Sequence, residues 1–329
     1  MSGGMKVSFE KMSFPLKKPF VITGYTFHTT DTIRVTLEKD GVRGQGEGVG
    51  VYYLGDTLDV MVDLVSEIAP DLERGLSREE LQEALPPGGA RNAIDCAMWD
   101  LEAKLSGRSI WHRLNLSPKS LKTVSTIGIG STKTMAQSAR DFAKYSKLKI
   151  KLDADNPIGK LEAIRAARPD ASLIIDVNQG WSFDELKEYA PHCARLGIDM
   201  VEQPLKRGED SVLEGFTSPV PLGADESCLH EGEFETAAGR YDVINIKLDK
   251  CGGLSSGLKL VDMARRGGKR LMVGNMTGSS LSMAPAYVVG QYCEFVDIDG
   301  PLLLACDLDN ALFYSTGGVV EVPNAALWG

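Results

Sequence analysis

From about residue 120 onward, short apolar runs alternate with stretches of helical character at a nearly constant interval. The runs are TVSTIGIG (123–130), LKIKLD (148–153), SLIIDVNQ (172–179), IDMVEQP (198–204), PLGADES (221–227), DVINIKLDK (242–250), RLMVGN (270–275) and EFVDIDG (294–300). A late polar residue recurs about every 25 residues, the length of one strand, one helix and two short loops. Eight such units, with amphipathic helices between the strands, predict an α/β fold of the (β/α)8 TIM-barrel type.

A doubly wound open sheet is the alternative fold for such a repeat. It requires a glycine-rich phosphate-binding loop after its first strand, and the sequence has none there. The glycine-rich segments GQGEG (44–48) and GGLSSG (252–257) fit that motif poorly, and we expect both to be tight turns.

The first third of the chain has a different pattern and predicts an α+β unit. TIRVTLEKDGVRGQGEG (32–48) holds two strand-like runs about an Asp40–Gly41 turn, which indicates a hairpin. In ARNAIDCAMWDLEAKLSG (90–107), apolar residues recur at helical spacing and Gly107 ends the helix. We therefore predict three parts: an α+β capping domain at 1–115, the barrel at 116–306, and a C-terminal segment at 307–329 whose GGVVEVP strand returns to the capping domain.

Composition excludes several classes of partner. The 329 residues carry a net charge of −9, which argues against binding to nucleic acid or to an anionic membrane surface. No apolar run reaches 18 residues, and the N-terminal sequence MSGGMKVSFEKMSF lacks the apolar core of a signal peptide. We therefore expect a partner that is a small molecule, and a chain that does not enter a membrane.

The cysteines and histidines do not form a metal motif. Six cysteines are scattered without a CxxC pair, so we expect free buried thiols and a location in the reducing cytoplasm. The four histidines are isolated too, which disfavours zinc. Any bound metal must then be held by carboxylates, and such hard oxygen ligands favour magnesium or manganese.

Charged residues stand late in successive runs, at the end of a barrel that carries catalysis. Side chains along a barrel strand alternate between the interior and the helix layer. In LKIKLD the apolar residues must face the helices, so Lys149 and Lys151 point inward. In DVINIKLD the same reasoning turns Asn245, Lys247 and Asp249 to the inner face. The inward carboxylates at matching positions are Asp176, Glu202, Asp225, Asp297 and Asp299.

Asp176, Glu202 and Asp225 lie on three successive strands and can converge on one Mg²⁺. Lys151 precedes the three acids and Lys247 follows them, so the two amines would approach the metal from opposite sides. Such a site can take a proton from the α-carbon of a metal-bound carboxylate and return it on the other face. Magnesium makes this possible because it stabilises the doubly negative enediolate.

A lysine acts as a base only when it is neutral, and its ordinary pKa is about 10.4. Lys149 stands two residues before Lys151 and supplies a like charge that would lower the pKa of Lys151. The cation would add to this effect. We therefore count Lys149 among the substrate-site residues.

These residues, in this order, resemble the enolase superfamily, and specifically its muconate-lactonising-enzyme-like subgroup. The motifs that carry the resemblance are K-I-K at 149–151, D-V-N at 176–178, E-Q-P at 202–204, A-D-E-S at 224–227 and N-I-K-L-D-K-C-G-G at 245–253. The match extends to A-R-N-A-I-D-C-A-M-W-D-L at 90–101 and covers nearly the whole chain. It implies one Mg²⁺ on the three carboxylates, with the two lysines as the acid/base pair.

Within the subgroup, the chain looks most like the dipeptide epimerases of the L-Ala-D/L-Glu type. In those enzymes an Asp-x-Asp at the end of the eighth strand holds the α-ammonium of the substrate, and D-I-D-G-P at 297–301 matches it. Asp297 and Asp299 are two residues apart, so both can face inward and bind one cation. The resemblance therefore implies a Mg-dependent enzyme that inverts the α-carbon of the C-terminal residue of a dipeptide.

One segment departs from the relatives that are selective for Ala-Glu. Those enzymes carry an arginine just after the motif F-V-I (20–22), whereas TGYTFHTTD (23–31) has no Arg or Lys and places Phe27 there. A glutamate side chain would lack its charged partner, so we expect weak Ala-Glu activity and a preference for an uncharged or hydrophobic residue. The candidate walls of that pocket are Tyr25, Phe27, Tyr52 and Tyr53. The residues expected on the carboxylate side are Thr126 and Met276.

Other functions stay open. N-acylamino acid racemisation or o-succinylbenzoate synthesis would use the same lysines and metal, but an N-acylated substrate would leave Asp297 and Asp299 unpaired at a free-energy cost. Sugar-acid dehydration is disfavoured because the resembling enzymes that carry out that reaction have a His–Asp pair at the position where Lys247 stands. If the chain were a binding protein that has lost activity, we would expect a gap in the acid/base pair or in the metal-ligand set, whereas every position here is filled. We expect the enzyme to be a homo-oligomer.

Overall fold

The structure, a computed structural model, describes residues 4–329. Its N-terminal part is an antiparallel sheet of β1 (Lys6–Ile22), β2 (Tyr25–Lys39) and β3 (Val42–Val49), in that order. The helices of this part are α1 (Leu58–Glu73), α2 (Arg78–Ala84), α3 (Gly89–Ser106) and α4 (Ile110–Arg113). The predicted hairpin is confirmed: β2 and β3 meet at Asp40 and Gly41, whose φ angles of 50° and 78° suit a tight primed turn.

The segment GQGEG belongs to strand β3, so the prediction of a tight turn there is wrong. The strand lies directly against α3, and a Cβ atom added at Gly46 would lie 2.1 Å from the carbonyl oxygen of Ala93. Glycine is required because strand and helix backbones approach so closely. In GGLSSG, Gly252 and Gly253 do form a turn, between α9 (Leu248–Cys251) and α10 (Leu254–Arg266), and the rest of the segment is helical.

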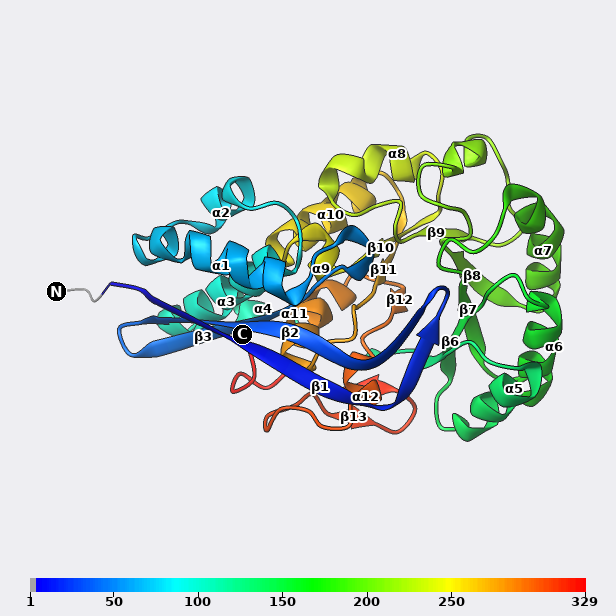
Figure 1. Cartoon of the computed structure of the whole chain (residues 1–329), viewed down its shortest axis with the longest axis horizontal. Coiled ribbons are helices and arrows are strands. Elements are labelled where there is room, and N and C mark those ends of the chain that lie inside the picture. The colour runs from blue at the N-terminus through cyan, green and yellow to red at the C-terminus, as the bar shows by residue number, and fades with distance from the viewer. Residues whose placement is uncertain (1–3) are drawn as a thin grey trace.

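Eight parallel strands in sequential order form the predicted barrel, which is confirmed (Figure 1). They are β5 (Ser125–Ile127), β6 (Lys147–Lys151), β7 (Ser172–Asp176), β8 (Ile198–Glu202), β9 (Leu222–Ala224), β10 (Val243–Ile246), β11 (Arg270–Val273) and β12 (Phe295–Val296). The backbone N–H of Val124 donates to the carbonyl oxygen of Val296 at 3.0 Å, which joins the first strand to the last. The barrel interior below the active end is filled with apolar side chains, namely Val124, Ile174, Met200, Val243, Met272 and Phe295.

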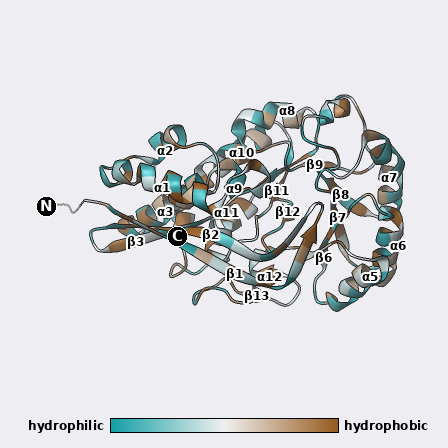
Figure 2. Ribbon diagram, viewed as in Figure 1, coloured by the Kyte–Doolittle hydropathy of each residue, from teal (hydrophilic) through white to brown (hydrophobic). Residues whose placement is uncertain are grey.

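Helices surround the barrel, and Figure 2 shows hydrophilic and hydrophobic residues side by side on the outer ones, as expected of amphipathic helices. They are α5 (Thr132–Asp141), α6 (Pro157–Ala167), α7 (Phe183–Arg195), α8 (Phe234–Ala238), α10, α11 (Ser280–Gly290) and α12 (Gly300–Leu303). The helix predicted between β8 and β9 is replaced by a short 3-10 turn, Asp210–Leu213. Gly208 and Gly215, both with positive φ, and Pro219 interrupt that connection.

The C-terminal segment forms β13 (Tyr314–Ser315) and β14 (Val319–Val320), which make a small sheet with β4 (Leu121–Lys122). The GGVVEVP strand thus pairs beside the start of the barrel and not with the N-terminal sheet, contrary to prediction. The last residues do reach α3, where Trp328 Nε1 donates to the carbonyl oxygen of Cys96 at 2.9 Å. The division at 1–115, 116–306 and 307–329 stays a prediction.

The tip of the β1–β2 hairpin lies on the carboxyl ends of the barrel strands (Figure 1). Thr23 Oγ1 donates to the carbonyl oxygens of Leu152 and Val177 at 3.4 Å and 3.3 Å, just beyond β6 and β7. The hairpin therefore covers the end of the barrel where the predicted site residues lie.

Two general predictions can be compared with the structure here. All six cysteines are free thiols, as expected; four of them are buried, whereas Cys293 is half-buried and Cys306 is exposed. Of the helices between residues 4 and 329, none combines the length and the apolar character that a membrane crossing requires.

Candidate active site

Six charged side chains meet at the carboxyl ends of β6 to β10. They are Lys149 and Lys151 of β6, Asp176 of β7, Glu202 of β8, Asp225 just after β9 and Lys247 just after β10. None is more than 7% exposed, and the predicted inward alternation is confirmed for all of them. Asp249 is the exception to the predicted alternation, because the chain enters α9 after Lys247. Asp249 instead faces α3 and accepts a hydrogen bond from Asn92 Nδ2 at 2.7 Å.

Asp176, Glu202 and Asp225 form an acidic triad, in which one carboxylate oxygen from each lies within 4.8 Å of the others. Burial alone would raise the pKa of Asp176, but neighbouring lysines outweigh it and lower that pKa to about 2. Burial would also raise the pKa of Asp225, but Lys247 and Lys250 outweigh it and hold that pKa well below its usual range. Burial and the charge of Asp176 raise the pKa of Glu202 to about 7. The triad is a set of hard oxygen donors suited to a divalent cation.

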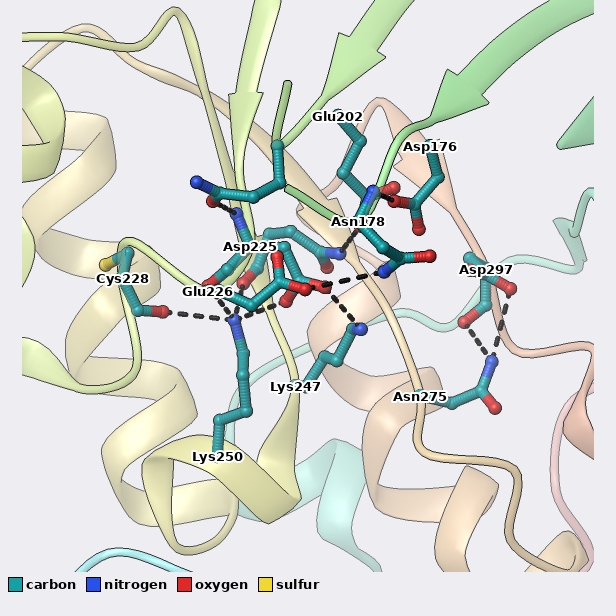
Figure 3. A network of polar contacts seen from close by, with 12 residues as sticks. Asp176, Asn178, Glu202, Asp225, Glu226, Cys228, Lys247, Lys250, Asn275 and Asp297 are labelled. Carbon is teal, nitrogen blue, oxygen red and sulfur yellow. Dashed lines mark hydrogen bonds and ion pairs between the residues drawn. The ribbon is translucent and has the colours of Figure 1, made fainter. Parts of the chain in front are cut away.

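Lys151 and Lys247 flank the acidic triad on the two neighbouring strands. Lys151 Nζ lies 2.7 Å from Asp176 Oδ2 and donates to Asn178 Oδ1 at 2.9 Å. Lys247 Nζ lies 2.6 Å from Asp225 Oδ2 (Figure 3). Burial would lower the pKa of Lys247, but the charge of Asp225 raises it above its ordinary value. Lys247 therefore holds its proton in this arrangement.

The sequence suggested that Lys149 presents an uncompensated charge to Lys151, but in the structure this charge is compensated. Its Nζ lies 2.8 Å from Glu202 Oε2, 3.0 Å from Asp176 Oδ2 and 2.8 Å from Asp297 Oδ2. Burial would lower the pKa of Lys149, but these three carboxylates raise it well above its ordinary value. Lys149 thus joins the acidic triad to the Asp297 site beneath the cavity.

Lys250 is a member of the site that the sequence reasoning missed. Its side chain is fully buried, and Nζ lies 2.6 Å from Asp225 Oδ1 (Figure 3). The same Nζ donates to the carbonyl oxygens of Cys228 at 3.1 Å and Asn245 at 3.2 Å. Its position three residues after Lys247, in K-L-D-K, was the available signal, because that spacing places both lysines on one side of a helical turn.

Two amide side chains also position the acidic triad. Gln203 Oε1 accepts hydrogen bonds from the backbone N–H groups of Asp225 at 2.9 Å and Ser227 at 3.0 Å. Gln203 has a φ of 37°, an unusual backbone conformation that clusters at functional sites. Asn245, which was predicted to point inward, donates from Nδ2 to Glu202 Oε1 at 2.7 Å. Gln203 of the motif E-Q-P therefore holds the backbone at Asp225 on the neighbouring strand, while Asn245 holds the carboxylate of Glu202.

Asp297 and Asp299 follow β12 and are 4% and 3% exposed. Asp297 Oδ1 accepts a hydrogen bond from Asn275 Nδ2 at 3.2 Å (Figure 3). Asp299 Oδ2 accepts one from the backbone N–H of Thr126 at 2.8 Å, so Thr126 joins the site through its main chain. Burial, followed by the charge of Asp297, raises the pKa of Asp299 to about 7. A further cation beside the pair would therefore stabilise the ionised form of Asp299.

A cavity of 290 Å³ lies between the hairpin and the strand ends. The predicted residues that line it are Lys151, Lys247, Asp225, Phe27, Tyr52, Tyr53 and Met276. Tyr25 is outside the lining: it is 45% exposed, and its ring centroid lies 4.4 Å from that of Tyr52. The other predicted residues, including Lys149, Asp297 and Asp299, are not among the lining residues, but Asn275, which lines the cavity, donates to Asp297 Oδ1.

Glu226 also lines the cavity and was not predicted to take part. Its Oε1 accepts a hydrogen bond from Asn178 Nδ2 at 3.4 Å, and within residues 4–329 its buried Oε2 has no hydrogen-bond partner. Burial and the charge of Asp225 raise the pKa of Glu226 to about 8. Its place in A-D-E-S, directly after Asp225, was the available signal.

Comparison with known families gives matches over both parts of the chain. Residues 5–114 match the mandelate racemase/muconate lactonizing enzyme N-terminal domain. Residues 132–326 match a family described as enolase C-terminal domain-like.

Individual relatives are similar over most of their length. The chain is 39% identical over 308 residues to the L-Ala-D/L-Glu epimerase of Escherichia coli, covering 93% of this chain and 96% of that one. It is 40% identical to the N-acetyl-D-glutamate racemase of a Pseudoalteromonas species, over 78% of this chain and 81% of that one. A crystal structure from Agrobacterium tumefaciens, an enolase family member with bound sodium and L-Ala-L-Glu, has a TM-score of 0.96 and 39% identity. That likeness covers 99% of this chain and 100% of that one.

Proposed function

Since the chain belongs to the mandelate racemase/muconate lactonizing enzyme family of the enolase superfamily, we propose that it inverts the α-carbon of the C-terminal residue of a dipeptide in a Mg²⁺-dependent reaction. The chain is an isomerase of the epimerase type, given its similarity to L-Ala-D/L-Glu epimerases over nearly its whole length. The observation that carries the finer proposal is that Lys151 and Lys247 flank a buried acidic triad from the two adjoining strands.

The two lysines would divide one proton transfer between two faces of the substrate. With the α-carbon between the two amines, one lysine removes the α-proton and the other delivers a proton to the opposite face. Asn178 holds Lys151 at 2.9 Å, which orients its amine relative to the cavity. Because the hairpin covers both amines, water is kept from exchanging protons with the substrate at the wrong face.

The residues present fit a divalent cation on the acidic triad. Around the strand ends of the described chain, buried carboxyl groups outnumber buried lysines: Asp176, Glu202, Asp225, Glu226, Asp297 and Asp299 face Lys149, Lys151, Lys247 and Lys250. Buried charge of one sign is costly unless it is compensated. Mg²⁺ would supply that compensation, and it would stabilise the negative charge that develops on the substrate carboxylate when the α-proton leaves.

We propose that Asp297 and Asp299 bind the α-ammonium group of the dipeptide. The pair carries more negative charge than Lys149 alone offsets, and Asp299 lacks a cationic partner within the described residues. An ammonium group would supply that partner. This role accounts for two neighbouring carboxylates at a place that is almost closed to solvent.

The cavity lining supports a preference for an uncharged or hydrophobic C-terminal side chain. The hairpin and the segment after it contribute Phe27, Asp31 and Tyr52 to the cavity lining. Among the described residues, they contribute no lysine or arginine to it. A glutamate side chain would meet aromatic rings and a carboxylate without a cation to pair with. This preference would separate the enzyme from the Escherichia coli relative that is named for Ala-Glu.

A second candidate function is racemisation of an N-acylated amino acid. The 40% identity to an N-acetyl-D-glutamate racemase favours it. The same lysines and acidic triad would serve, but the acylated nitrogen carries no positive charge. Asp297 and Asp299 would then stay unpaired at a cost in binding free energy.

Turnover in D₂O tests both candidates. Dipeptides and N-acetylamino acids are incubated with the Mg²⁺-loaded enzyme and analysed by mass spectrometry. We expect deuterium at the C-terminal α-carbon of both epimers of hydrophobic dipeptides. Lys151→Ala should lose exchange from one epimer and Lys247→Ala from the other. Equal residual exchange in both variants would contradict the two-base mechanism, and Ala-Glu as the best substrate would contradict the preference. Faster exchange on N-acetylamino acids than on every dipeptide would favour the second candidate.

A further inference from the structure

The main chain of Ile298, between Asp297 and Asp299, is held at its N–H and at its carbonyl oxygen by side chains of distant segments. Strand β12 ends at Val296, so the main chain of Ile298 lies beyond the barrel strand. Its N–H donates to Thr123 Oγ1 at 3.0 Å, and its carbonyl oxygen accepts a hydrogen bond from the Tyr314 hydroxyl at 2.6 Å. Ile298 is completely buried, so these two side chains take the place of water.

The two side chains belong to one connected unit. Tyr314 lies in β13, and Thr123 lies between β4 and β5. The backbone N–H of Thr123 donates to the carbonyl oxygen of Gly318 at 2.9 Å, in the turn of the β13–β14 hairpin. The C-terminal segment is therefore fastened to the start of the barrel at the same place from which it holds Ile298.

Holding the main chain of Ile298 restricts the relative direction of the two carboxylates. Along the chain Asp297 and Asp299 are joined through Ile298, so a rotation about the backbone dihedrals of Ile298 would move one carboxyl group relative to the other. The outer ends of the pair are anchored separately, at Lys149 for Asp297 and at the N–H of Thr126 for Asp299. Together with these anchors, the main chain of Ile298 sets the distance between them.

We propose that Tyr314 and Thr123 are positioning residues for substrate recognition, which set the geometry of the Asp297–Asp299 pair for the ammonium group of the dipeptide. The C-terminal segment thus takes part in binding the substrate although it contributes no residue to the cavity lining within the described chain. This inference rests on the proposed function of the carboxylate pair. It assigns no proton transfer to either residue.

The variant Tyr314→Phe tests the inference, because it removes only the hydroxyl group. We expect KM for a hydrophobic dipeptide to rise about fivefold, the effect of one lost hydrogen bond, while kcat stays within about twofold. The matched control is Tyr287→Phe. The Tyr287 hydroxyl also ties this region together, by donating to the carbonyl oxygens of Lys119 at 2.7 Å and Val320 at 3.3 Å, but it does not contact Ile298. This control should lose stability without a change in KM.

A second pair of variants provides rescue by a conservative change. Thr123→Val removes the acceptor for the Ile298 N–H and should raise KM, whereas Thr123→Ser keeps the hydroxyl and should restore it. This pair carries the test if Tyr314→Phe does not fold. An unchanged KM in both Tyr314→Phe and Thr123→Val, or an equal rise in Tyr287→Phe, would overturn the inference.

Calorimetric titration separates this inference from the proposed function. Affinity for the dipeptide and for its N-acetyl form is measured in wild type and in Tyr314→Phe with Mg²⁺ present. Weaker binding of the free dipeptide alone supports the positioning role, whether or not the ligand is turned over. If wild type shows no preference for the free ammonium, the proposed role of the carboxylate pair fails. If it shows that preference and Tyr314→Phe keeps it unchanged, only the positioning role fails.

Discussion

Lys250 Nζ lies 2.6 Å from Asp225 Oδ1, and both side chains are essentially inaccessible to solvent. The other carboxylate oxygen of Asp225 lies 2.6 Å from Lys247 Nζ. The carboxylate of Asp225 is therefore held through one oxygen by Lys250, which is not part of the cavity lining. Its other oxygen contacts Lys247, the lysine proposed to move protons. Lys250 fixes the direction of the third oxygen donor before any cation binds.

Replacing Lys250 by methionine is expected to weaken metal binding about 10- to 100-fold, as the loss of a group that orients a metal ligand typically does. Removing one partner of a buried ion pair should also reduce stability by about 3 kcal/mol or more. Isothermal titration with Mg²⁺ and urea unfolding measure the two effects. Lys160→Met is the matched control, since Lys160 is buried and paired with Asp153 outside the acidic triad. Equal Mg²⁺ affinity in both variants would contradict this role of Lys250.

Removal of divalent metal should destabilise the protein as well as stop the reaction. Because Mg²⁺ binds the folded acidic triad and not the unfolded chain, a concentration of 100 times Kd should raise the free energy of unfolding by about 2.7 kcal/mol. Thermal unfolding in EDTA and in Mg²⁺ measures this rise. Asp176→Asn should lose it, while Asp170→Asn, at an exposed aspartate paired with Arg168, should keep it. A rise that survives in Asp176→Asn would place the cation elsewhere.

A positive charge in the cavity wall should change substrate preference. Phe27 lines the cavity, and Phe27→Arg would give a glutamate side chain the cationic partner that it lacks. We expect kcat/KM for Ala-Glu to rise about tenfold relative to that for a hydrophobic dipeptide, equivalent to about 1.4 kcal/mol. The ratio from paired kinetic assays is the readout. Phe313→Arg, at a phenylalanine that is 67% exposed outside the cavity, should leave the ratio unchanged.

Stability should depend on pH through Glu47, which is fully buried and accepts hydrogen bonds from the backbone N–H and the hydroxyl of Ser279, both at 2.7 Å. Burial raises the pKa of Glu47 to about 7. The folded state then holds this proton more tightly than the unfolded state, so the free energy of unfolding should fall as pH rises from about 4.5 to 7.

Glu47→Gln removes that titration. Relative to wild type, the free energy of unfolding of this variant should therefore rise over the same pH range, by up to about 3 kcal/mol at pH 7. Urea unfolding at pH 5 and pH 7.5 gives the two differences. The control Glu188→Gln, at an exposed glutamate, should show the same change in free energy of unfolding between the two pH values as wild type. A constant difference between Glu47→Gln and wild type would show that Glu47 does not titrate in this range.

The barrel was predictable from sequence because its signals are local. A strand needs a short apolar run, and the interval to the next run reflects one helix and two loops. Alternation along a strand then told which side chains face inward, and Lys151, Asp176 and Lys247 lie where that rule puts them. The rule failed at Asp249, where the strand gives way to α9 and the alternation ends.

Contacts between distant segments were not predictable in the same way. The glycines of β3 suggested turns, yet they are needed because α3 packs directly on that strand, and only the packed structure contains both elements. The strand GGVVEVP was recognisable, but its partner β4 was not, since hydrogen-bonded pairing depends on where the chain returns in space.

The sequence by itself determined the barrel, the set of inward charges and the order of acids and lysines along it, because backbone periodicity assigns each side chain a face without knowledge of its neighbours. Only the tertiary structure decided which charges pair. Lys149 turned out to be compensated by three carboxylates, Lys250 holds Asp225, and Tyr314 holds the peptide between two aspartates. The physical reason is that hydrogen bonds and ion pairs act over about 3 Å, and residues far apart in sequence come within that distance only when the whole chain is folded.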